Sequence, residues 1–61
     1  MKRTLRIAIL SEIRENISHD LDLFQDMNFV TSDIKEKQAL IRKINYSKSL
    51  INEIDEMIAE L

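Results

Sequence analysis

The chain contains no glycine and no proline among its 61 residues. These two residue types most disfavour a helix interior, so their absence favours long, uninterrupted helices. Apolar residues recur at spacings of three and four, which is the pattern of one helix face. The first series starts near Leu5 and comprises Leu10, Ile13, Ile17, Leu21 and Phe24; the second comprises Ile34, Leu40 or Ile41, Ile44, Ile51, Ile54 and Ile58. The pattern predicts one helix over about residues 3–27 and another over about residues 33–60.

The segment NFVTSDIKE interrupts this periodicity. Asn28 is a residue type that readily adopts the left-handed conformation that ends helices, and the aromatic and β-branched residues after it prefer extended backbone. Asp33 and Glu36 form a pattern that resembles a capping box, and Ser32 is an alternative cap. The sequence therefore predicts a turn over about residues 28–32, and a connection this short joins antiparallel helices.

The distribution of charge also favours a hairpin. Each predicted helix starts basic and ends acidic: Lys2, Arg3 and Arg6 precede Asp20, Asp22 and Asp26, and Lys35, Lys37, Arg42 and Lys43 precede Glu53, Asp55, Glu56 and Glu60. Folding at the turn brings each block beside its opposite, whereas like charges four residues apart within one helix repel. We predict an all-α, antiparallel two-helix hairpin that forms one domain over residues 1–61. The alternative is one continuous helix in a long coiled coil.

Each predicted helix carries more apolar surface than one neighbouring helix can cover. Its apolar arc approaches about 200°, about twice what an amphipathic surface helix needs. We predict that the surplus forms an interface made of Leu5, Ile9, Leu23, Ala39, Tyr46, Leu50, Met57 and Leu61, with Met27 beside them. The hairpin is therefore expected to dimerise into a four-helix bundle, similar in shape alone to the plasmid copy-number protein Rop. The alternative is a monomer with a few exposed apolar residues.

A chain of this length has a marginal core and usually depends on a disulfide, a metal or a partner for stability. It has no cysteine and one histidine, which excludes disulfides, thiolate metal sites and a zinc site built mainly on imidazoles. We predict no cofactor and no metal. A partner chain, either a second copy or another protein or both, is expected to supply the missing stability.

Polar residues are predicted to meet halfway along the hairpin. Asn16 and Ser18 in the first helix come level with Asn45, Ser47 and Ser49 in the second. Such a polar layer can fix the register of packed helices at some cost in stability. The alternative is that Ser47, which lies on the isoleucine series, is a small residue at a close helix crossing.

His19 is the one residue with candidate chemistry. It shares the outer face of the first helix with Glu15, Asp22 and Asp26. This stripe could be interpreted as a divalent-metal site or as a solvated surface. We expect the solvated surface, because metal sites in helix bundles converge on the core from several helices.

The run ENISHDL, which contains His19, resembles the H-box of sensor histidine kinases. That resemblance implies a phosphoaccepting histidine on the first helix of a dimeric hairpin, with His19 as the nucleophile and Asp20 as its acidic neighbour. The family continues with a basic residue, then Thr or Asn, then Pro. Here those positions hold Asp22, Leu23 and Phe24.

The expected function is that of a small cytoplasmic protein–protein interaction module, a regulator, adaptor or small chaperone without enzymatic activity. The apolar run in MKRTLRIAIL is too short for a secretory signal, and no run approaches the roughly 20 apolar residues of a membrane span. Two alternatives stay open. One is a phosphorelay hairpin that depends on His19, and the other is a Rop-like hairpin that binds nucleic acid. Nucleic acid is disfavoured because the basic residues are divided into blocks, and each block is expected to lie beside acidic residues of opposite charge.

Overall fold

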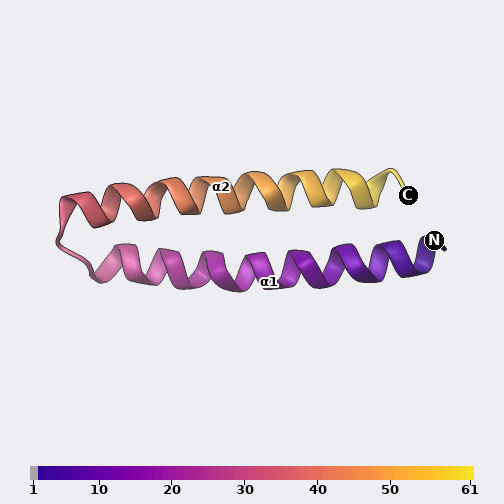
Figure 1. Ribbon diagram of the computed structural model, residues 1–61, viewed down its shortest axis with the longest axis horizontal. Helices are drawn as coiled ribbons and strands as arrows, with labels where there is room; N and C mark the ends of the chain where they lie inside the picture. Colours follow the sequence, from indigo (N-terminus) through magenta and orange to yellow (C-terminus); the bar gives the residue numbers. More distant parts are fainter. Residues whose placement is uncertain (1) are drawn as a thin grey trace.

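The computed structural model describes residues 2–61, which form two helices packed side by side as an antiparallel hairpin. Helix α1 spans Arg3–Val30 and helix α2 spans Ile34–Ala59. Figure 1 shows both chain ends at one end of the hairpin and the turn at the other. The Cα atoms extend over 47 × 15 × 13 Å. The predicted all-α two-helix hairpin is confirmed, whereas Met1, which the predicted domain includes, lies outside the described residues.

The turn consists of Thr31, Ser32 and Asp33 alone. Thr31 has extended backbone, and its N–H donates to the carbonyl of Met27 at 3.0 Å. Asp33 is the N-cap of α2, and its carboxylate accepts from the backbone N–H of Lys35 at 2.9 Å and of Glu36 at 3.5 Å. This cap satisfies two of the four amide groups that a helix N-terminus leaves unpaired. The carboxylate of Asp33 therefore explains why the second helix starts where the sequence predicts.

The end of α1 differs from the prediction. The helix was expected to end near residue 27, with Asn28 in the left-handed region, but it continues through Phe29 and Val30. No described non-glycine residue has a positive φ angle. The ammonium group of Lys37 in α2 donates to the carbonyl of Asn28 at 3.0 Å. Because this bond satisfies one of the last helical carbonyls, and the extended Thr31 makes the turn, the chain needs no left-handed residue.

The interior of the hairpin is small and lies mainly on α2. The buried residues are Leu40, Ile44, Ser47 and Ile54, all from α2, whereas α1 has no fully buried side chain. The half-buried apolar residues of α1 that face them are Ile7, Leu10, Ile17, Leu21 and Phe24. Between the two candidates at the start of the second series, the structure buries Leu40 to 4% exposure and leaves Ile41 at 47%. Burial of so few side chains leaves the hairpin with a core that is marginal for its length.

Neither helix is apolar enough over a sufficient length to cross a membrane, as judged over the described residues.

Candidate functional site

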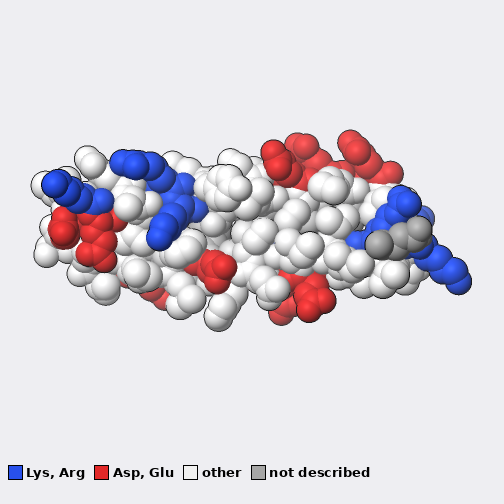
Figure 2. Space-filling model, viewed as in Figure 1, with Lys and Arg blue, Asp and Glu red and all other residues white. Residues whose placement is uncertain are grey.

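One face of the hairpin exposes apolar side chains from both helices, and we call it the apolar face. Its residues are Leu5, Ile9, Ile13, Leu23 and Met27 from α1, and Ala39, Tyr46, Leu50, Met57 and Leu61 from α2. On a helical wheel with 100° per residue, the side chains of each group point, on average, about 90–110° away from the direction of the other helix. The space-filling view shows an uncharged surface across the middle of the hairpin, with basic groups toward both ends and acidic groups along its edges and, at one place, within its lower half (Figure 2).

Two contacts show that these stripes of α1 and α2 lie on the same side of the hairpin. Ile9 and Leu10 share a depression of about 300 Å³ with Met57 and Leu61, and Arg6 lines its rim. Nearer the turn, the ammonium group of Lys43 lies 5.6 Å from the centre of the Phe24 ring. The apolar face is therefore a continuous feature of the folded hairpin rather than two separate helix stripes.

The predicted interface residues are not equally available for a partner. Six of them are exposed: Leu5, Ile9, Leu23, Ala39, Tyr46 and Met57. Leu50 and Leu61 are only half-exposed, because they also pack between the helices. Ile13 was assigned to the interior of the hairpin, yet it is 43% exposed and belongs to the apolar face. Whether these residues contact a partner stays a prediction.

Three large apolar side chains surround the turn and are still more exposed. Phe29 is 88% exposed, Val30 79% and Ile34 71%. Ile34 was expected to lie on the interior series, but it occupies the first position of α2 and is directed away from the buried residues of that helix at 100° per residue. Phe29 and Ile34 point away from the apolar face at 100° per residue, so the turn forms a separate apolar tip.

The opposite face of the hairpin carries an ion pair. Arg14 donates to both carboxylate oxygens of Asp55, from Nε at 2.6 Å and from Nη2 at 3.2 Å. This is the one ion pair among residues 2–61, and its arginine belongs to neither predicted basic block. The hydrogen bond from Arg14 holds the pKa of Asp55 below its ordinary value of 3.8, and the same bond raises the pKa of Arg14 above its ordinary value.

The Arg14–Asp55 pair predicts a small, acid-sensitive contribution to stability. Because the pKa of Asp55 is lower in the folded chain, the pair stabilises the fold above about pH 4, and this contribution is lost as the pH falls through the lowered value. Asp55→Asn should therefore destabilise the hairpin at neutral pH and have no effect near pH 2. Urea titrations at both pH values measure the difference. Equal effects at both would contradict the assignment, and Arg14→Gln should abolish the pH dependence of the substitution.

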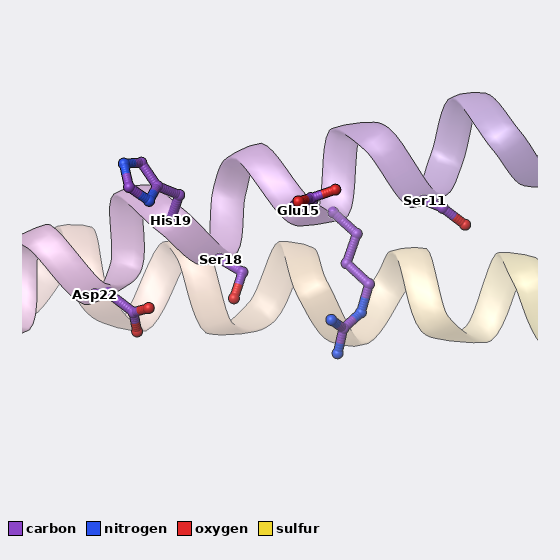
Figure 3. A pocket seen from close by; sticks show the side chains of 6 residues that line it. Ser11, Glu15, Ser18, His19 and Asp22 are labelled. Carbon is purple, nitrogen blue, oxygen red and sulfur yellow. The ribbon is translucent and has the colours of Figure 1, made fainter.

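His19 lies on the same side of α1 as this ion pair. A shallow depression of about 430 Å³ is lined by Ser11, Arg14, Glu15, Ser18, His19 and Asp22, all from α1. Figure 3 shows His19 projecting from the outer side of that helix, away from α2. No group of three or more His, Cys, Asp or Glu side chains within residues 2–61 is arranged to hold a metal ion. A depression lined by a single helix provides no converging groups for binding or for chemistry.

The chain matches no protein-family model, and no significant match was found among curated proteins or among solved structures.

Proposed function

We propose that this chain is a protein–protein interaction module, and that its apolar face packs against the apolar face of a second copy to form a four-helix bundle. The observation that carries the proposal is the continuous exposure of apolar side chains from both helices on one side of the hairpin. A soluble monomer rarely exposes an apolar surface that extends along its whole length, and such a surface is typical of an interface.

The size of the apolar face suits a stable dimer. A standard interface buries about 800 Å² on each partner, and the hairpin presents a face with Cα extents of 47 by 15 Å. Among residues 2–61, only three apolar side chains are buried within the hairpin itself, namely Leu40, Ile44 and Ile54. Burying the exposed apolar side chains against a partner would supply the stability that this small interior lacks.

The distribution of charge favours a second copy as the partner. Both helices start basic and end acidic, and Figure 2 shows groups of opposite sign at both ends of the molecule. When two hairpins pack face to face around a two-fold axis, each helix lies antiparallel to its new neighbour. Every basic start then lies beside an acidic end, so the chain is complementary to itself.

In this proposal the dimer acts through contact with other proteins, as a regulator, adaptor or small chaperone. Pairing of the apolar faces leaves the faces with the Arg14–Asp55 pair and the apolar tips at the turn uncovered. The dimer would therefore present each of these surfaces twice. No described feature favours phosphotransfer or nucleic-acid binding over this proposal.

The mass of the chain in solution tests the proposal. Equilibrium sedimentation at micromolar concentration should give twice the chain mass. The melting temperature should rise with protein concentration, because association stabilises the folded state by mass action. A monomer whose melting temperature is independent of concentration would overturn the proposal. A dimer that dissociates steeply with added salt would point to charge rather than apolar burial as its cause.

A further inference from the structure

The outward positions of α1 on the apolar face follow a symmetric spacing. Five residues of α1 point in directions that fall within about 40° of one another at 100° per residue. They are Leu5, Ile9, Asn16, Leu23 and Met27. Two of them lie 11 and 7 residues before Asn16, and two lie 7 and 11 residues after it. Residues 7 and 11 positions from any helical residue point within about 20° of it. What is particular to α1 is that all four such residues around the polar Asn16 are apolar.

Helix α2 repeats this spacing on the same face. Its five positions also point within about 40° of one another, and they are Ala39, Lys43, Leu50, Met57 and Leu61. They lie 11 and 7 residues on either side of Leu50. Around the apolar Leu50, three of these four residues are apolar and the fourth is Lys43.

The two central residues, Asn16 and Leu50, lie at the same height along the hairpin. Ile9 and Met57 line one depression, and Phe24 lies beside Lys43. Asn16 is 7 residues after Ile9, and Leu50 is 7 residues before Met57. Since every helical residue rises by about 1.5 Å, Asn16 comes level with Leu50 to within about one residue. Counting from the Phe24–Lys43 contact gives the same result.

A two-fold axis that crosses the hairpin at this height would place the apolar residues of α1 opposite one another and bring the two Asn16 side chains together. We infer that the second copy packs on the apolar face with its turn at the opposite end, and that the Asn16 side chains of the two copies meet at the axis. This inference rests on the proposed dimer. In this arrangement each helix packs antiparallel against the same helix of the second copy. The opposing pairs are Ile9 with Leu23, Leu5 with Met27, Asn16 with Asn16, Leu50 with Leu50, Ala39 with Leu61, and Lys43 with Met57.

A rival two-fold arrangement places both turns at the same end, so that α1 packs against α2 of the second copy. It brings Asn16 opposite Leu50. Lys43 lies opposite an apolar residue in both arrangements, Leu23 here and Met57 in the first, so it does not distinguish them. In the rival arrangement the carboxamide of Asn16 would be buried against an apolar side chain without a hydrogen-bond partner, which is unfavourable. Two facing asparagines can instead satisfy each other, and a buried pair of this kind fixes the register of packed helices. Charge does not distinguish the arrangements, because both place basic helix starts beside acidic ends.

Cysteines introduced by substitution can locate the two-fold axis without background cross-linking, because the chain has no cysteine of its own. Asn16→Cys and Leu50→Cys, each alone, should form disulfides between identical chains under mild oxidation, since a disulfide requires Cα atoms within about 7 Å. Glu15→Cys is the matched control, because it lies at the same height on the opposite side of α1. Its cross-linking should be slower by about tenfold or more, as its thiols would not meet.

The outcomes separate this inference from the proposed dimer. If wild-type chain sediments as a dimer but Asn16→Cys chains link only to Leu50→Cys chains, the rival arrangement holds and this inference is wrong. Failure of both variants to cross-link, when sedimentation shows that their reduced forms are dimers, also overturns it. A monomeric wild-type chain overturns both proposals at once.

A distance measurement at the turn is independent of these substitutions. Ser32 is exposed and has no contact with the apolar face, so Ser32→Cys with a spin label leaves the interface intact. Pulsed electron paramagnetic resonance should give a separation between labels close to the 47 Å length of the hairpin. The rival arrangement places the two turns side by side, roughly 20 Å apart or less, given helix diameters of about 10–12 Å. The shorter distance in a confirmed dimer would refute the inference.

Discussion

Replacing Met57 with lysine should dissociate the proposed dimer. Met57 is 52% exposed in the hairpin and lines the depression it shares with Ile9, so the substitution affects a partner contact more than the fold of one chain. In the dimer the new ammonium group would be buried opposite Lys43 of the second copy, and both copies would carry it. The expected cost is about 3 kcal/mol or more, which weakens association by about 100-fold or more.

Ile41→Lys is the matched control for this experiment. Ile41 lies on the same helix, is 47% exposed and points to the opposite side of the hairpin, so its substitution should leave the dimer intact. Met57→Glu tests the cause, because its carboxylate would lie opposite Lys43 of the second copy and should weaken the dimer less than Met57→Lys does. Sedimentation equilibrium of the three variants gives the answer. Equal dimerisation of Met57→Lys and Ile41→Lys would show that the apolar face is not the interface.

Sequence periodicity was sufficient to predict two antiparallel helices and the start of the second one. Asp33 precedes an apolar series and lies three residues before Glu36, and the structure confirms its carboxylate as the helix cap. The reciprocal bond of a capping box does not form, because the Glu36 carboxylate instead accepts from the hydroxyl of Thr31 at 3.1 Å. The end of α1 was not predictable from propensity. Differences of tenths of a kcal/mol per residue are outweighed by a contact such as that of Lys37 with the Asn28 carbonyl, which forms only after the chain has folded.

The apolar face was predicted in outline but not at its borders. A helical wheel predicted surplus apolar residues, because an arc of about 200° exceeds what one neighbour covers, and six of the eight predicted interface residues are exposed in the hairpin. It could not show where the interior ends, since neighbouring positions on a helix wheel differ by only about 20–40°. Leu50 was therefore placed wholly on the outer face although it is half-buried, and Ile13 was placed inside although it is 43% exposed. The sequence also could not show that Asn16 and Leu50 lie at the same height along the hairpin, because that follows only from the contacts between the helices.

Replacing Leu40 with alanine should have the largest effect on the fold itself. Leu40 is the most buried apolar side chain, at 4% exposure, and it is one of only three such residues in the interior. Truncation of a buried leucine costs about 2–5 kcal/mol, since the cavity is only partly refilled. For a domain of this size that corresponds to a fall in melting temperature of about 10 °C or more. Far-ultraviolet circular dichroism during heating and urea titration, at one fixed protein concentration, measures both quantities.

The neighbouring residue gives a control within the same helical turn. Ile41 is 47% exposed, so Ile41→Ala should change the free energy of unfolding by no more than about 0.5 kcal/mol, as expected for a surface position. The two substitutions remove similar amounts of side chain from adjacent residues, and only their directions on the helix differ. A large cost at Leu40 with little at Ile41 follows if α2 packs on α1 through the side that bears Leu40, Ile44 and Ile54. Similar costs at both positions would mean that α2 is rotated about its axis, and that the apolar face and its two-fold arrangement are assigned to the wrong side of the hairpin.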